Sequence, residues 1–149
     1  MPMIYSPDRS YYQYEFITTF EETNVVGNIY FANYAVWQGK CREHFLYDYC
    51  PEIIDEVNSG LALITLDLSI EYISQLFAFD RVVIKMFLEA KSSSRLLMRF
   101  EYYKINIAGD YELVARGAQS TMAMRLMNDR LTPVEYPKSI FRVFEEFNI

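Results

Sequence analysis

The sequence has 149 residues, a length typical of one domain, and a formal net charge of -6 at pH 7. A protein that binds nucleic acid needs a basic face for the phosphates, so this acidic balance disfavours that class. Cys41 and Cys50 are too few for a disulfide framework and lack metal-ligand spacing, so we expect neither a metal nor a cofactor. No stretch has the length of a membrane span, and residues 1–13 lack a secretory signal pattern, which favours the cytoplasm and no membrane contact.

The aromatic content is the most unusual part of the composition. The chain is 52% hydrophobic and 17% aromatic, with 13 Tyr and 11 Phe. This is more than a core of this size needs, and two explanations stay open: a lined ligand cavity or a large interface between subunits.

The first half of the chain predicts one strand and one long helix. Residues 1–12 are typical of a loose arm, and residues 13–20 alternate as a first strand does. Residues 23–28 predict a turn, in which Gly27 supplies a positive backbone dihedral. From Ile29 to about Tyr49, apolar residues recur every three or four positions, which predicts a helix that Pro51 ends. This helix is apolar on nearly all sides, so we expect protein around it.

The second half predicts four strands, at 61–74, 81–91, 95–107 and 111–127, before a short amphipathic tail at 139–147. In the first of these, alternation predicts one apolar face and one polar face. The apolar face comprises Ala62, Ile64, Leu66, Leu68, Ile70 and Tyr72, and the polar face comprises Thr65, Asp67, Ser69 and Glu71. A buried helix followed by four such strands favours an α+β domain spanning residues 1–149, in which an antiparallel sheet curls around the helix.

Two residues point to chemistry at a carbonyl group. Asn24 precedes the turn glycine, and Arg42 lies on the helical stripe that also carries Tyr34. An amide and a guanidinium hold a carbonyl oxygen well but are poor bases, which indicates a site that polarises a carbonyl for attack by water. Simpler roles stay open. Asn24 also suits a turn, and Arg42 also suits an ion pair with Glu43, Asp48 or Glu71.

The segment ETNVVGNIYFANY, at 22–34, resembles the active-site segment of the 4-hydroxybenzoyl-CoA thioesterase branch of the hot-dog fold. In that branch an acidic residue usually stands three positions before the glycine, and here that residue is Asn24. Together with WQGKCRE at 37–43, this departure is similar to the thioesterases of enediyne polyketide biosynthesis. The resemblance implies a long central helix wrapped by an antiparallel sheet. It also implies homodimers that pair into tetramers, with each site built from two subunits.

The resemblance implies an enzyme that hydrolyses a β-ketoacyl polyene thioester from the acyl-carrier domain of an iterative polyketide synthase. The β-keto acid then loses carbon dioxide and becomes a methyl-ketone polyene. Asn24 and Arg42 would be the catalytic residues. The expected substrate-binding residues are Tyr34, Thr65, Gly27, Phe31 and Phe45. Strict alternation places Thr65 on the face away from the helix, so only a bulge or a neighbouring subunit would bring it into the site.

Three alternatives remain. A general acyl-CoA or aroyl-CoA thioesterase would use Glu71 as its base. A non-catalytic acyl-binding module would account for the missing carboxylate. A hot-dog dehydratase needs a histidine with a carboxylate, and His44, the only histidine, lies on the helix face opposite Arg42.

Overall fold

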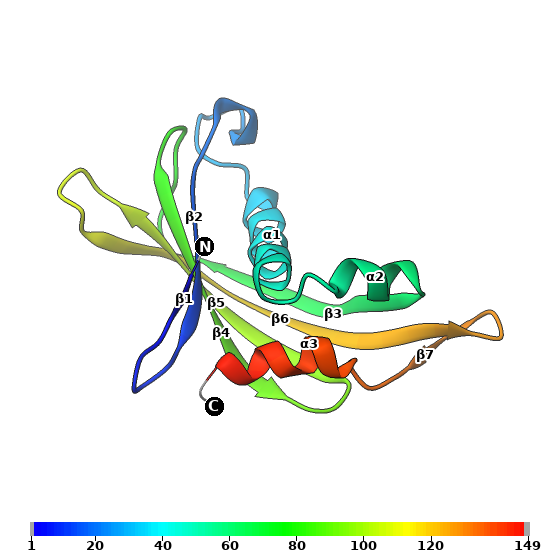
Figure 1. Cartoon of the computed structure of the whole chain (residues 1–149). Helices are drawn as coiled ribbons and strands as arrows, with labels where there is room; N and C mark the ends of the chain where they lie inside the picture. Colours follow the sequence, from blue (N-terminus) through cyan, green and yellow to red (C-terminus); the bar gives the residue numbers. More distant parts are fainter. Residues whose placement is uncertain (1, 148–149) are drawn as a thin grey trace.

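An antiparallel sheet wraps around one long helix in the computed structural model, which describes residues 2–147 (Figure 1). The strands are β1 (Met3–Ile4), β2 (Tyr11–Ile17), β3 (Leu61–Tyr72), β4 (Arg81–Lys91), β5 (Arg95–Ile105), β6 (Tyr111–Met127) and β7 (Arg130–Pro133). The helices are α1 (Ala32–Tyr49), α2 (Ile53–Asn58) and α3 (Lys138–Val143), with 3-10 turns η1 (Phe20–Glu22) and η2 (Phe144–Glu146). The predicted α+β hot-dog architecture is confirmed.

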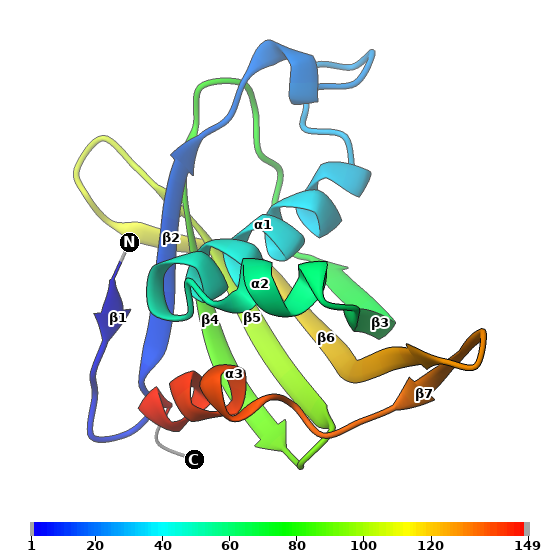
Figure 2. The ribbon, with the colours of Figure 1, turned by 45° about the vertical axis from the view of Figure 1, so that its right-hand side comes forward.

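The sheet order is β1-β2-β4-β5-β6-β3, and β7 continues the sheet by pairing with the end of β6. Figure 2 shows α1 crossing one face of this sheet, with α2 and α3 on the same face. Strand β3 has β6 as its partner on one side only, so its other edge is open within the described residues. Three elements differ from what the sequence predicts. Residues 3–4 pair with β2, so the expected loose arm is wrong there, and the sequence did not predict α2 or β7.

Close packing fixes α1 against the sheet. Gln38 in α1 has no exposed surface, and its Oε1 accepts a hydrogen bond from the Tyr102 hydroxyl at 2.7 Å. Its Nε2 donates to the carbonyl of Ala118 at 3.2 Å. Gly117 lies so close that a Cβ atom there would be 2.0 Å from Gln38 Oε1. These contacts set the depth and rotation of α1, and so determine where Arg42 emerges.

A β-bulge in β3 changes which residues face the helix. Thr65 pairs with Thr121 of β6 and Asp67 with Ser120, so Leu66 is an extra residue in the register. Before the bulge, Leu61 and Leu63 pack toward the core. After it, the even-numbered residues do, as the contact between the Tyr72 and Tyr34 rings shows. The predicted strict alternation is therefore wrong, and Thr65 lies on the helix side.

Candidate active site

The turn before α1 is held by its own backbone. The Gly27 N–H donates to the Asn24 carbonyl at 3.0 Å, and Gly27 has the positive φ of 91° that such a turn requires. The side-chain Oδ1 of Asn24 accepts a hydrogen bond from the Val26 N–H at 3.0 Å. The amide oxygen is thus already engaged, and the NH₂ group is the end of Asn24 that can donate to a ligand.

Glu22 ties this turn to the helix, a role that we did not predict. Its Oε2 accepts a hydrogen bond from Trp37 Nε1 at 2.5 Å, and its Oε1 accepts one from the Thr19 N–H at 2.9 Å. Its carbonyl accepts a hydrogen bond from Asn33 Nδ2 at 2.8 Å. The spacing of Thr19 and Glu22 is that of a capping box, which was the available sequence signal.

Arg42 emerges from the middle of α1 as a half-buried cation. Its Nη1 donates to Thr65 Oγ1 at 3.4 Å, and its buried Nε has no hydrogen-bond partner. Burial lowers the pKa of the guanidinium, while Glu43 and Tyr136 raise it, and an arginine stays charged at any pH relevant here. Within residues 2–147, no carboxylate lies close enough to form an ion pair with Arg42. The ion-pair alternative therefore has no support.

The bulge brings Thr65 to this cation from the sheet. Besides the bond from Arg42, Thr65 Oγ1 accepts a hydrogen bond from Gln119 Nε2 at 3.3 Å. Gln119 lies on β6 with only 2% of its surface exposed, and its Oε1 is buried without a partner. A single glutamine in a strand gives no sequence signal for a functional site. Only the pairing of β3 with β6 shows that Gln119 lies next to Thr65.

An apolar groove of about 630 Å³ borders Arg42 between α1, α2 and β3. Its apolar walls include Leu46, Ile53, Ile54, Val57, Leu61 and Leu63. The volume falls in the range of small-molecule sites. The groove therefore combines a long apolar wall with one cation, an arrangement that suits an acyl chain ending in a polar, reactive group.

The other predicted binding residues lie in two places. Tyr34 is 3% exposed and packs against Trp37, Tyr72 and Tyr102, and burial raises its pKa to about 12. Phe45 has no exposed surface and belongs to an aromatic cluster with Phe144. Gly27 and Phe31 are exposed beside the turn.

One chain does not bring Asn24 and Arg42 together. Asn24 lies in the turn before the helix, whereas Arg42 is ten residues beyond the helix start at Ala32. At the rise of an α-helix, Arg42 lies roughly 15 Å along the axis from the helix start, and Asn24 lies in the turn before that start. A carbonyl oxygen held by both side chains would need them from two chains.

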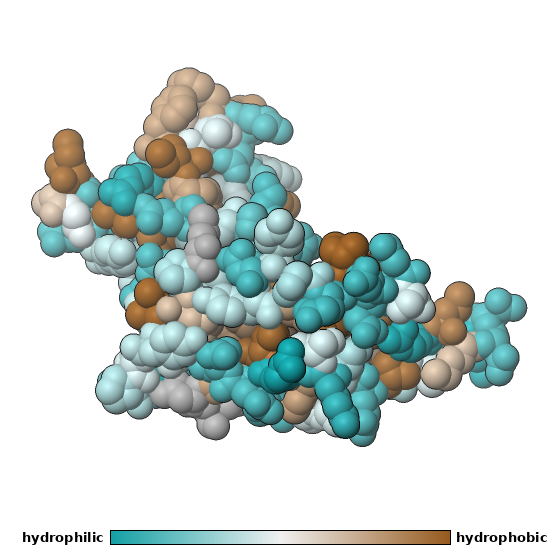
Figure 3. Space-filling model, in the orientation of Figure 1, coloured by the Kyte–Doolittle hydropathy of each residue, from teal (hydrophilic) through white to brown (hydrophobic). Residues whose placement is uncertain are grey.

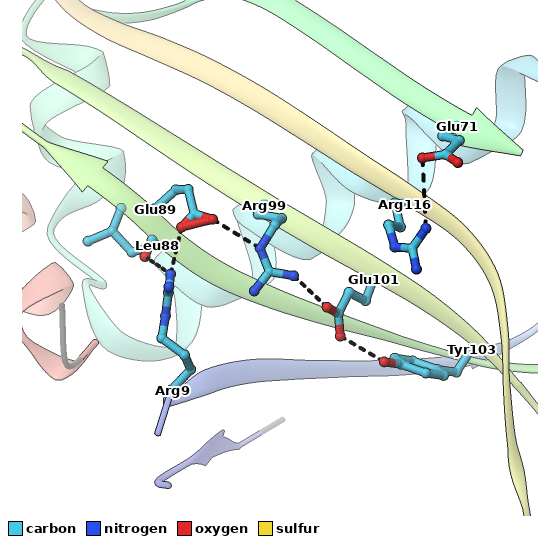
Figure 4. Close-up of polar contacts among 8 residues, drawn as sticks. All are labelled: Arg9, Glu71, Leu88, Glu89, Arg99, Glu101, Tyr103 and Arg116. Carbon is cyan, nitrogen blue, oxygen red and sulfur yellow. Dashed lines mark hydrogen bonds and ion pairs between the residues drawn. The ribbon is translucent and has the colours of Figure 1, made fainter. Parts of the chain in front are cut away.

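The alternative catalytic groups are poorly placed. Glu71 projects from the sheet face opposite α1, with 68% of its side chain exposed, and lies 3.9 Å from Arg116 (Figure 4). His44 is exposed and stacks on the Tyr14 ring at 5.0 Å. Cys41 is fully buried, and burial raises the pKa of its thiol, which disfavours a thiolate nucleophile. None of the helices in residues 2–147 is both long and apolar enough to span a membrane.

Comparisons with known proteins identify the group of enzymes to which this chain is similar. Residues 18–143 match the thioesterase-like superfamily. The chain is similar to the Dynemicin thioesterase, whose crystal structures describe polyene binding, with 39% identity and a TM-score of 0.86. That similarity covers 91% of this chain and 95% of the Dynemicin enzyme.

Two more distant structures share the fold. A mutant 4-hydroxybenzoyl-CoA thioesterase complexed with 4-hydroxybenzoyl-CoA is 16% identical, with a TM-score of 0.77, over 88% of this chain and 96% of its own. A 1,4-dihydroxy-2-naphthoyl-CoA thioesterase from Synechocystis is 19% identical, with a TM-score of 0.76, over 90% and 95%. At these identities the similarity shows only that the fold is shared. No curated protein sequence gives a significant match.

Proposed function

Because this chain belongs to the thioesterase-like superfamily and is a thioester hydrolase, we propose that its substrate is a β-ketoacyl polyene thioester on the acyl-carrier domain of an iterative polyketide synthase. The observation that carries this proposal is the half-buried guanidinium of Arg42 beside an apolar groove, with no carboxylate partner in residues 2–147 and with its Nε free of hydrogen bonds. The 39% identity to the Dynemicin thioesterase supports the polyene part.

Arg42 acts on the thioester carbonyl. When water adds to the carbonyl carbon, negative charge develops on the oxygen, and a fixed cation in a partly dehydrated site stabilises that charge. The tetrahedral intermediate collapses by breaking the C–S bond, and the thiolate leaves with the proton that the water gives up. The amide NH₂ of Asn24 donates the second hydrogen bond to the oxyanion.

A dimer builds the complete site. The open edge of β3 offers unpaired backbone groups to the same strand of a second copy, and such pairing extends one sheet into the next. The exposed Phe20, Val25 and Val26 around the catalytic turn give this end of the molecule an apolar surface (Figure 3). Asn24 of one chain then meets Arg42 of the other, and pairs of dimers form the tetramer.

The product acid then loses carbon dioxide. In a β-keto acid the C–C bond to the carboxyl group breaks with the electron pair passing to the ketone as an enol or enolate. Protonation at the α-carbon gives the methyl ketone. The enolate oxygen is on the ketone carbon, two carbons from the former thioester carbonyl, and Arg42 stabilises it once the product acid has shifted to bring that oxygen to the guanidinium.

The carrier partner must dock on a local basic region, since the whole chain is acidic. Lys91 and Arg95 flank the β4–β5 hairpin and line a recess of about 440 Å³. Neither forms an ion pair within residues 2–147, although the Lys91 ammonium lies 5.4 Å from the centre of the Phe141 ring. Their charges can therefore meet carrier carboxylates.

Single-turnover hydrolysis tests the proposal. A β-ketoacyl thioester is presented on a carrier domain and on CoA, and the products are identified by mass. We expect faster release from the carrier and a methyl ketone as the final product. A broad preference for CoA thioesters, with loss of activity in Glu71→Gln, would indicate the general acyl-CoA thioesterase instead. Tight binding without turnover of either substrate would indicate an acyl-binding module.

A further inference from the structure

Two glutamines are buried in this fold, and only one of them is fully hydrogen-bonded. Gln38, in α1, uses both ends of its amide, as described above. Gln119, in β6, donates from Nε2 to Thr65, while its Oε1 has no partner. A buried amide oxygen without a partner reduces stability, so a side chain kept in this state calls for an explanation.

The side chains nearest to Gln119 include hydrogen-bond donors. Arg42 and Thr65 meet at 3.4 Å, and Gln119 joins them through the same Thr65 oxygen. The guanidinium can only donate, so it can hold a carbonyl oxygen or an oxyanion but cannot orient water. Attack by water needs the opposite kind of group, an acceptor that takes one hydrogen of the water so that its lone pair faces the carbonyl carbon.

Three other candidate acceptors near the predicted chemistry are engaged or turned away, whereas Asn28 Oδ1, in the turn before α1, is buried without a partner. The Oδ1 of Asn24 is occupied by the Val26 N–H. Both carboxylate oxygens of Glu22 hold the turn to Trp37 and Thr19. Glu71 projects from the opposite face of the sheet.

We propose that Gln119 Oε1 binds the attacking water beside the thioester carbonyl held by Arg42 and Thr65. This inference rests on the proposed function and adds a residue to its site. The water oxygen forms the new bond to the carbonyl carbon, the carbonyl electron pair moves to the oxygen at Arg42, and the C–S bond then breaks. Gln119 takes no proton, because an amide is too weak a base. The proton passes to the leaving thiolate sulfur.

The test combines stability with a competition between nucleophiles. Gln119→Met removes the unpaired oxygen and keeps the side-chain length, so we expect an unchanged or higher melting temperature. The matched control, Gln38→Met, removes the acceptor for the buried Tyr102 hydroxyl at 2.7 Å, which then has only the Tyr34 carbonyl at 2.9 Å. It also removes the side-chain donor to the Ala118 carbonyl, so we expect a lower melting temperature. With a β-ketoacyl thioester on a carrier domain, Gln119→Met should lower kcat by up to about 100-fold with little change in KM.

Hydroxylamine is then added as a second nucleophile, and the ratio of hydroxamate to acid is measured. Hydroxylamine does not depend on a bound water, so this ratio should rise in Gln119→Met. In Gln119→Glu an acceptor remains at the same place. If the new carboxylate disturbs Arg42, attack by water and attack by hydroxylamine slow together. The ratio of hydroxamate to acid in Gln119→Glu should therefore stay close to that of the unmodified protein.

An unchanged ratio in Gln119→Met, with the unmodified protein active, would overturn the inference and leave the proposed function intact. So would a fall in melting temperature as large as that of Gln38→Met, since it would make Gln119 a structural residue. If the unmodified protein hydrolyses no thioester, the proposed function itself fails.

Discussion

The guanidinium of Arg42 and the hydroxyl of Thr65 meet at 3.4 Å across the gap between α1 and β3. This contact exists because β3 carries one extra residue, Leu66, which turns Thr65 toward the helix. It holds the cation at the border of the apolar groove, with the guanidinium Nε buried and unpaired. The predictions for Arg42 and Thr65 depend on that placement.

Arg42→Met should lower kcat by about 10²- to 10³-fold, because it removes the charge that stabilises the oxyanion. The variant should be at least as stable as the parent, since the cation has no carboxylate partner in the described residues and burial already disfavours it. Thermal unfolding and single-turnover hydrolysis measure the two effects. The exposed neighbour His44, changed to Ala, is the control and should retain full activity. Near-parental turnover in Arg42→Met would contradict the mechanism.

Thr65→Val keeps the shape of the side chain but removes the hydroxyl that Arg42 and Gln119 share. We expect roughly a tenfold lower kcat, the size of one lost hydrogen bond to a charged group. Thr65→Ser restores the hydroxyl and should recover most of the rate. If Thr65→Val keeps the parental rate, the hydroxyl and its bond to Arg42 have no role in the reaction.

Gly117→Ala should destabilise the fold by about 1–3 kcal/mol, because its Cβ would lie 2.0 Å from Gln38 Oε1. Gly39→Ala is the matched control. Gly39 lies inside α1 with open space around its Cα, so alanine there should stabilise the protein by about 0.5–1 kcal/mol. Chemical denaturation of both variants measures this difference. Equal stability of the two would show that α1 sits farther from the sheet than described.

The chain pattern predicted the long helix and the four long strands, because both periodicities are clear over many residues. It misplaced Thr65, since an inserted residue such as Leu66 has no signature in an alternating strand and appears only when the partner strand is known. It also missed Gln119, because a single polar residue in a strand is ordinary until its unpaired oxygen is seen. Asn24 and Arg42 were singled out by their side-chain chemistry and by a resemblance, neither of which periodicity supplies, and their catalytic roles stay predictions.

The outer face of the sheet carries a charge network that predicts a pH dependence of stability. Glu89 accepts hydrogen bonds from Arg9 at 2.9 Å and from Arg99 at 3.2 Å (Figure 4). The hydrogen bond from Arg9, followed by the charges of Arg9 and Arg99, lowers the pKa of the Glu89 carboxyl against the opposing effect of burial. Such a group stabilises the folded state above its unfolded pKa of about 4.3, and the stabilisation disappears as pH falls through the lowered folded value.

Glu89→Gln should therefore lower the free energy of unfolding at neutral pH by less than about 1 kcal/mol, a small value because the pair is partly exposed. Urea denaturation at neutral pH and near pH 3 measures the effect, and the gap between variant and parent should shrink at the lower pH. The control is Glu71→Gln, whose pair with Arg116 is long and exposed. A gap that stays constant with pH would rule out the ionised Glu89 as its source.

The most direct test of the two-chain site mixes two inactive variants. Asn24→Ala and Arg42→Ala are each assayed for hydrolysis of a carrier-bound β-ketoacyl thioester, alone and after co-expression with different affinity tags. In a mixed dimer, one of the two sites receives Asn24 from one chain and Arg42 from the other, so random mixing should restore about a quarter of the parental activity. If mixed dimers form but stay as inactive as the single variants, Asn24 and Arg42 do not act on one carbonyl from two chains, and the account is wrong.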